Sequence, residues 1–206
     1  MAVKLTKNEQ KKQKDSLKQY ERYLPTLQLK KQQLQLVIRQ IEAEAEKVKK
    51  QKEELVASLD RWVAVFNENK SFPSKKRLEQ LVRIDSVKKG VGNIAGVTIP
   101  VFEEVSFKPV VYDYADYPLW VDSAVDALKE IAELDARNST LSRQVYLLEK
   151  ELRTTSQRVN LFEKVKIPEA RENIRKIGIY LGDQQTSAVV RGKIAKNKLV
   201  KVASND

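Results

Sequence analysis

Apolar residues recur at alternating intervals of three and four positions through the first third of the chain. Of the fifteen positions in this series, thirteen are apolar and two are lysine. The series runs through Leu17, Tyr20, Leu24, Leu27, Lys31, Leu34, Ile38, Ile41, Ala45, Val48, Lys52, Leu55, Leu59, Trp62 and Phe66. A 3.5-residue repeat sustained over about seven heptads is typical of a left-handed coiled coil. It predicts one long helix in residues 1–66.

A second series with the same spacing begins at Trp120 and ends at Phe162. Eleven of its thirteen positions are apolar, and the polar Asn138 is suited to fixing the register of a coiled coil. This series predicts a second helical segment in residues 119–206. The two stripes pair most simply as an antiparallel hairpin within one molecule, although pairing between separate chains would satisfy the same pattern. We assign ten residues to the seam between the helices: Leu34, Ile38, Ile41, Val48, Leu55, Leu141, Val145, Leu148, Leu152 and Val159.

The heptad phase slips near the C-terminus, at Ile167-Pro168. Continued strictly from Phe162, the series would next reach Lys166 and Glu169, which are both charged. The apolar positions resume instead at Ile174, Ile177, Leu181 and Ala188. Proline lacks an N–H and clashes with the preceding turn, so we expect a kink or a fresh helix start near Pro168. The helix that follows should present a different face to its partner.

Residues 67–118 follow a different pattern and contain the clustered glycines and most of the prolines. Leu81–Val87 and Thr98–Phe107 are rich in β-branched residues that roughly alternate with polar ones. This alternation predicts a small β-hairpin lobe. Lys89-Gly90 and Gly92-Asn93 supply residues that favour turns.

Proline at position 100 places its strand at a sheet edge or a bulge, because proline cannot donate to a central ladder. Pro109–Tyr112 is a candidate third strand. A lone hairpin is marginally stable in water, so we expect this one to rest on the helices or on a partner. Phe102 and Trp120 are expected to fill the core of the lobe. The predicted fold is mainly α, a long antiparallel two-helix coiled coil with a small central β-hairpin lobe.

The composition agrees with long helices and removes several kinds of chemistry. Charged residues make up 33% of the chain, aromatic residues 7%, and Gly and Pro number 6 each. Histidine and cysteine are absent, which excludes thiolate metal sites, disulfides and the usual general base at neutral pH. We therefore expect no catalytic, cofactor-binding or metal-binding residues. No apolar run approaches the ~20 residues of a membrane span, and no secretory signal begins the chain, so we expect a soluble cytoplasmic protein.

Charge is distributed unevenly along the chain. The net charge is +11, which indicates an anionic partner. The side chains from Met1 to Lys18 sum to +4, those from Thr186 to Asp206 sum to +4, and those from Val101 to Ala136 sum to −7. An antiparallel hairpin would bring both termini to one basic end and leave the other end acidic, although terminal lysines that only aid solubility would produce the same pattern. We define the basic tip as Lys4, Lys7, Lys11, Lys12, Lys14, Arg191, Lys193 and Lys196.

Three stretches of sequence carry a recognisable pattern. They read LPTLQLKKQQL at Leu24–Leu34, NIAGVTIPVFEEV at Asn93–Val105, and QRVNLFEKVKIP at Gln157–Pro168. Together they resemble the D subunit of the V/A-type rotary ATPases, and the likeness spans nearly the whole chain. Leu161-Phe162 stands where the third motif of the family has Ala-Leu. The residues that match this motif are Arg158, Val159, Asn160, Glu163, Ile167 and Pro168.

The resemblance implies a non-catalytic rotor protein that has no nucleotide site. Members of the family are antiparallel coiled-coil rods whose terminal end enters the bore of a hexamer of A and B subunits. The rest of the rod binds the small F subunit and reaches the membrane rotor through the C (or d) subunit. Such a protein would be cytoplasmic, peripheral to the membrane, and would couple nucleotide turnover to ion movement. The basic tip would face the hexamer, and Asn160 and Glu163 would contact the hexamer or the F subunit, or serve the seam.

Other classes of protein fit the sequence less well. A nucleic-acid-binding protein would suit the net charge, but the basic residues are spread along helices without interleaved aromatic residues or a known motif. A cytoplasmic coiled-coil scaffold would explain the two seams equally well, but it does not predict the middle segment or the phase slip. An enzyme is the weakest interpretation, since both histidine and cysteine are missing.

Overall fold

The computed structural model describes residues 3–60, 81–111, 117 and 120–203 of the chain. It divides into two compact units, of which unit 1 comprises Met1–Lys30 with Thr154–Asp206 and unit 2 comprises Lys31–Arg153. Trp62 and Phe66, the last two positions of the first apolar series, lie outside the described residues. The predicted boundaries between segments 1–66, 67–118 and 119–206 also fall at or next to residues outside the described part, so this division stays a prediction.

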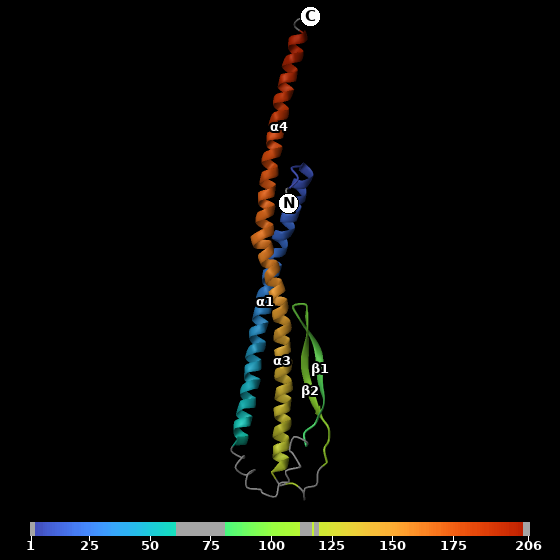
Figure 1. Cartoon of the computed structure of the whole chain (residues 1–206), viewed down its shortest axis with the longest axis vertical. Coiled ribbons are helices and arrows are strands. Elements are labelled where there is room, and N and C mark those ends of the chain that lie inside the picture. The colour runs from blue at the N-terminus through green and yellow to red at the C-terminus, as the bar shows by residue number, and fades with distance from the viewer. Residues whose placement is uncertain (1–2, 61–80, 112–116, 118–119, 204–206) are drawn as a thin grey trace. The chain divides into compact units, whose positions relative to one another are not determined.

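The described chain consists of three long helical stretches and one hairpin (Figure 1). In chain order the elements are α1 (Lys7–Asp60), β1 (Ile84–Ile94), β2 (Val97–Phe107), α3 (Val121–Leu161), the π-helix η2 (Phe162–Lys166) and α4 (Ile167–Ala203). Thr6 caps α1, since its hydroxyl accepts a hydrogen bond from the Glu9 N–H at 3.3 Å. Helix α1 continues through Pro25. The predicted fold class, mainly α with a small β-hairpin, is confirmed.

In unit 2, the second half of α1 packs antiparallel against α3. Leu34 and Ile38 of α1 share a buried cluster with Leu148 of α3. Further along α1, Glu44 forms an ion pair with Arg137, and Lys52 forms one with Asp135 at 2.6 Å. The partner numbers on α3 fall as those on α1 rise, so this pair runs antiparallel within one molecule, as the two apolar series predict.

The hairpin of β1 and β2 turns at Ala95-Gly96, not at the glycines that the sequence suggested. Ala95 has φ 51° and Gly96 has φ 81°, the backbone of a two-residue primed turn that matches strand twist. Lys89-Gly90 and Gly92-Asn93 lie inside β1, so the prediction that they form turns is wrong. Gly92 allows close packing instead, because a Cβ there would lie 2.9 Å from Val101 Cγ2.

The hairpin rests on the helix pair of unit 2, as its small size requires. Ile99 of β2 is buried in the cluster of Leu34, Ile38 and Leu148. The Gln144 side chain of α3 donates a hydrogen bond to the Pro100 carbonyl. A two-stranded sheet has only edge strands, so Pro100 lies at an edge as predicted.

The predicted third strand at Pro109–Tyr112 is wrong for its described residues. Positions 109–111 have no strand conformation, and Tyr112 lies outside the described residues. Leu81, Val121 and Val125 form a second buried cluster in unit 2, against which Val82, Val110, Tyr117 and Trp120 pack. Trp120 thus packs against a cluster that includes the start of α3, and not within the core of the hairpin as predicted. The segment after β2 contributes side chains to this cluster rather than a strand.

In unit 1, the first part of α1 packs against the end of α3, η2 and α4. The rings of Tyr20 and Phe162 lie 5.1 Å apart between centroids. Arg171 of α4 donates to the Glu21 carboxylate at 2.8 Å. The predicted change of face at Ile167-Pro168 is present. It is made by a π-turn rather than by a break, since the Ile167 N–H donates to the Phe162 carbonyl five residues back.

Candidate functional site

The last part of α4 is a helix without a packing partner in the described chain. From position 182 to position 198 every side chain is exposed. Val189 is 60% exposed, Val190 49% and Ile194 51%. Figure 1 shows this part of α4 continuing well past the start of α1, which belongs to the same unit. A helix that buries nothing is marginally stable alone in water, so this stretch is suited to binding another protein.

All eight residues of the basic tip are exposed and belong to unit 1, but they fall into two sets. Lys7 to Lys14 lie beside the first half of α4, because a Cβ at Gly178 would lie 3.4 Å from Gln10 Nε2. Arg191 follows Gly178 by thirteen residues, about 20 Å along a helix at 1.5 Å per residue. The fold therefore places Arg191, Lys193 and Lys196 along the exposed end of α4, staggered from the N-terminal lysines.

The net positive charge of the chain comes from unit 1 alone. Its residues include 19 Lys and Arg against 8 Asp and Glu, a net charge of +11. Unit 2 contains 20 of each sign and is neutral. A field of one sign over one unit attracts anionic partners to it and steers their approach. The exposed end of α4 therefore combines apolar side chains with a strong positive field.

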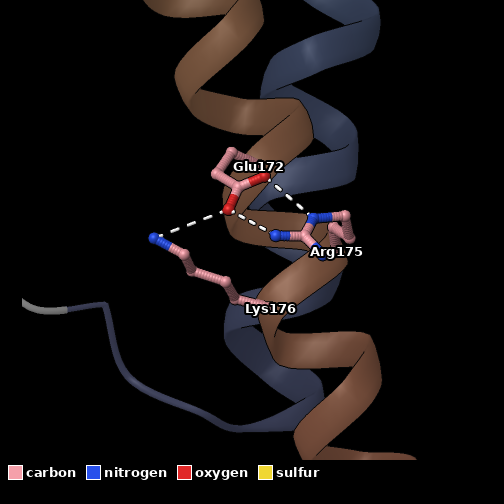
Figure 2. A network of polar contacts seen from close by, with 3 residues as sticks. All are labelled: Glu172, Arg175 and Lys176. Carbon is pink, nitrogen blue, oxygen red and sulfur yellow. Dashed lines mark hydrogen bonds and ion pairs between the residues drawn. The ribbon is translucent and has the colours of Figure 1, made fainter.

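Glu172, Arg175 and Lys176 form a network on the surface of α4 (Figure 2). Arg175 Nε and Nη2 donate to the two Glu172 oxygens at 2.9 and 2.8 Å, and Lys176 Nζ lies 3.6 Å from the same carboxylate. The hydrogen bonds from Arg175, with the positive charges of Arg175 and Lys176, hold the pKa of Glu172 below its ordinary value. The same bonds raise the pKa of Arg175. The network places two positive charges beside one carboxylate on the surface of α4.

The family motif at the end of α3 has an inner and an outer set of residues. Val159 and Ile167 are buried, while Arg158, Asn160, Glu163 and Pro168 are exposed. Within the described part of the chain, the side chains of Arg158, Asn160 and Glu163 make no hydrogen bond or ion pair with one another or with other residues. These three polar groups are therefore available to a second protein.

The ten seam residues all lie on the inner side of their helices. Leu34, Ile38, Val48, Leu148 and Val159 are buried. Ile41, Leu55, Leu141, Val145 and Leu152 are partly buried. Val159 belongs to unit 1 and the other nine to unit 2.

Sequence reasoning missed the polar contacts between elements. These include the ion pairs Glu44–Arg137, Lys52–Asp135 and Glu21–Arg171, and the hydrogen bond from Gln144 to Pro100. Opposite charges flanking a heptad seam are a usable signal, but they can be matched only once the register of the two helices is known. The described residues contain no group of three or more His, Cys, Asp or Glu that could hold a metal ion.

Comparison with known proteins places this architecture in a family. Residues 9–197 match the family model of the ATP synthase D subunit, a range that covers most of the chain. The chain belongs to the family of ATP synthase D subunits. The motif from Arg158 to Pro168 and the hairpin both lie inside the range that this family model matches.

Relatives in this family of D subunits match the chain from end to end. It is 48% identical over 203 residues to the V-type ATP synthase D subunit of Borreliella burgdorferi, with 98% of each chain covered. It is 38% identical over 200 residues to the protein of the same name from Chlamydia muridarum, with 96% of each chain covered. The V-type ATP synthase D subunit of Chlamydia pneumoniae is 36% identical over 198 residues, which cover 96% of this chain and 93% of the relative. Among the helices of the described chain, none is long and apolar enough to cross a membrane.

Proposed function

We propose that this chain is the non-catalytic central-rotor subunit of a V/A-type rotary ATPase. It transmits torque between the nucleotide-hydrolysing hexamer of A and B subunits and the ion-translocating rotor in the membrane. The observation that carries the proposal is the full-length similarity to proteins named as the D subunit of V-type ATP synthases, at up to 48% identity among those compared. In each unit, the antiparallel helix contacts described above fit this role.

Torque transmission requires a chain that resists twisting. Two helices joined by interlocking side chains resist twist better than one helix, because rotation of either helix must displace buried side chains of the other. The seam residues supply this resistance, with Leu34 and Leu148 fully buried in unit 2. Ion pairs such as Lys52–Asp135 flank the seam and oppose sliding of the helices.

The exposed end of α4 is assigned to the bore of the A/B hexamer. Its apolar side chains, including Val189 and Ile194, would be covered there, and Arg191, Lys193 and Lys196 would face acidic or polar groups of the bore. Exposed ion pairs contribute about 0–1 kcal/mol each, so they can bias the angular position of the rotor without holding it fast. Lys4, Lys7, Lys11, Lys12 and Lys14 would meet the hexamer at a different level, since the two sets are staggered.

Other partners follow from the same assignment. The exposed Arg158, Asn160 and Glu163 are assigned to contacts with the hexamer or the small F subunit. The C (or d) subunit would join the chain to the membrane rotor, so the chain would be cytoplasmic and peripheral to the membrane without inserting into it. Nucleotide hydrolysis is assigned to the A and B subunits of the hexamer.

Truncation after Leu181 tests this function directly. Residues 182–198 bury no side chain, so the shortened chain should melt at nearly the same temperature as the full chain. Mixed with A and B subunits, the full chain should co-purify with the hexamer and restore ATP-driven ion transport in the complete complex, whereas the shortened chain should do neither.

The competing classes predict different results from the same preparation. A scaffold would bind no A/B hexamer at any chain length. A nucleic-acid-binding protein would retain nucleic acid at low salt and lose it steeply as salt rises. Equal binding of the full and shortened chains to the hexamer would contradict the role assigned to α4.

A further inference from the structure

The heptad phase slip and the π-helix η2 are two views of one feature. A strict series from Phe162 would bring these residues against α1: Lys166, Glu169, Asn173, Lys176 and Tyr180. The side chains that occupy the inner face are instead each one position later, namely Ile167, Ala170, Ile174, Ile177 and Leu181. Ile167, Ala170 and Ile177 are buried, with Ile177 at 0% exposure. The apolar face has therefore moved by one residue.

A π-turn is the backbone form of a one-residue insertion in an α-helix. The Ile167 N–H bonds to the Phe162 carbonyl, five residues back instead of four, so η2 takes up the extra residue. Pro168 follows directly, and its ring would clash with the carbonyl four residues before it in a regular α-helix. None of the five η2 residues is buried, although Phe162 touches Tyr20.

We propose that Phe162–Lys166 is a register joint, in which one extra residue keeps the apolar face of α4 on α1 and Pro168 fixes where that residue is taken up. The extra residue is required because the apolar positions of α4 are offset by one from the series that ends at Phe162. Pro168 alone would not require it. None of the five side chains of the joint is buried, whereas Val159 before it and Ile167 after it are, so it is the place where the packed helices of unit 1 yield first to twisting.

Deletion of Lys164 in a Pro168→Ala background tests the register. Lys164 is exposed, and its removal places Ile167, Ala170, Ile174, Ile177 and Leu181 on an unbroken series of three and four from Phe162. The deleted chain should then form a continuous α-helix through this region. It should melt no lower than the Pro168→Ala chain.

Insertion of one alanine after Lys164, in the same background, is the matched control. It adds a second extra residue and moves the apolar positions off the inner face, so the melting temperature should fall clearly. If deletion and insertion lower the melting temperature equally, the extra residue does not serve to keep the apolar face of α4 on α1. If Pro168→Ala alone abolishes the π-turn, as judged by nuclear magnetic resonance of the backbone at Phe162–Ile167, the proline and not the phase creates it.

Whether the helix opens more readily at Phe162–Lys166 than beside it is tested first on the isolated chain and then in the complex. Amide hydrogen exchange at Val165–Ile167 should be faster than at Ala170–Ile174, and the deletion should remove the difference; equal exchange in the parent chain would overturn the yielding. The consequence for coupling rests on the proposed function: the deleted chain should support ATP hydrolysis with a loss of ion transport per ATP. Unchanged transport would refute that consequence, whereas failure of the parent chain to restore hydrolysis would refute the proposed function and leave the melting result intact.

Discussion

At the scale of single residues, a leucine stabilises the fold on the inner side of a helix and contributes little on the exposed side. Leu34 and Leu36 lie two positions apart on α1, and they are 0% and 59% exposed. Leu34 contributes buried area and fills space beside Ile38 and Leu148, whereas Leu36 faces solvent. The heptad pattern distinguishes them without knowledge of the partner helix.

Leu34→Ala should therefore lower the free energy of unfolding by about 2–5 kcal/mol, because it removes buried methyl groups and leaves a cavity. Leu36→Ala is the matched control and should change it by no more than about 0.5 kcal/mol. Urea unfolding followed by circular dichroism measures both. Similar losses for the two variants would mean that Leu34 is not at a packed seam.

The Glu172 network predicts a pH dependence whose sign is fixed by its lowered pKa. A carboxyl whose pKa is lower in the folded than in the unfolded chain stabilises the fold above its ordinary pKa, and this contribution disappears as pH falls through the lowered value. Glu172→Gln should therefore lose less stability than the parent chain on acidification. Melting curves across acidic pH measure this difference, which should shrink at high salt because the network is exposed.

Glu163→Gln is the control for that measurement, since Glu163 has no polar partner in the described part of the chain. Its acid profile should follow that of the parent chain. Parallel profiles for Glu172→Gln and the parent would contradict the role given to Arg175.

At the scale of elements, backbone geometry decides features that composition leaves open. Three of the glycines lie in α4, and three lie in the hairpin, where only Gly96 occupies the turn. A turn residue of φ +81° needs glycine, whereas a helical glycine weakens its helix relative to alanine. A glycine-to-alanine substitution should therefore stabilise α4 but destabilise the turn of the hairpin.

Gly182→Ala should strengthen α4 locally by about 0.5–1 kcal/mol, since a Cβ there meets nothing within 4 Å. Amide exchange around position 182 should slow accordingly. Gly96→Ala should weaken the hairpin by about 1–2 kcal/mol, because it forces a side chain into the left-handed region. A stabilised hairpin in that variant would contradict the assigned turn.

Docking of the hairpin depends on one polar contact as well as on Ile99. Gln144→Met keeps the size of the side chain but removes the donor to the Pro100 carbonyl. We expect a loss of about 1–3 kcal/mol in the free energy of unfolding, because a partly buried carbonyl is left without its partner. Gln35→Met, on the exposed side of α1, is the control and should be nearly neutral. Equal effects would mean that the hydrogen bond does not anchor the hairpin.

At the scale of the whole molecule, the difference in net charge between the two units acts over the longest distance. Unit 1 carries the entire net charge of +11, although unit 2 contains more charged residues. Such a field acts on the rate of encounter with an anionic partner more than on the stability of the fold. The two units can therefore supply a test and its control within one chain.

Replacing Arg191, Lys193 and Lys196 by glutamine should slow association with the A/B hexamer on the order of tenfold at low salt, and less at high salt. Replacing Arg39, Lys47 and Lys50 by glutamine removes the same charge from exposed positions of unit 2 and should change the rate little. Stopped-flow association kinetics compare the two triple variants. Equal slowing would assign the effect to net charge alone.

The periodicity of apolar residues by itself determined the helices, their inner faces and the phase slip. Leu34, Leu148 and Ile177 could be placed inside because the 3.5-residue repeat is a local property, repeated often enough to outweigh single exceptions such as Lys31 and Lys52. The separation of charge is likewise evident along the chain. The family motif pointed to the same family that the full-length comparisons show.

Only the tertiary structure decided which residues meet and how the backbone accommodates them. The turn at Ala95-Gly96, the contact from Gln144 to Pro100 and the stagger of the basic residues all depend on the register between elements distant in sequence. The sequence indicated that the helix changes face at Pro168. That a π-turn makes the change, and not a break, follows from the packing of α4 on α1 in unit 1, which favours continuous helical hydrogen bonding over a gap.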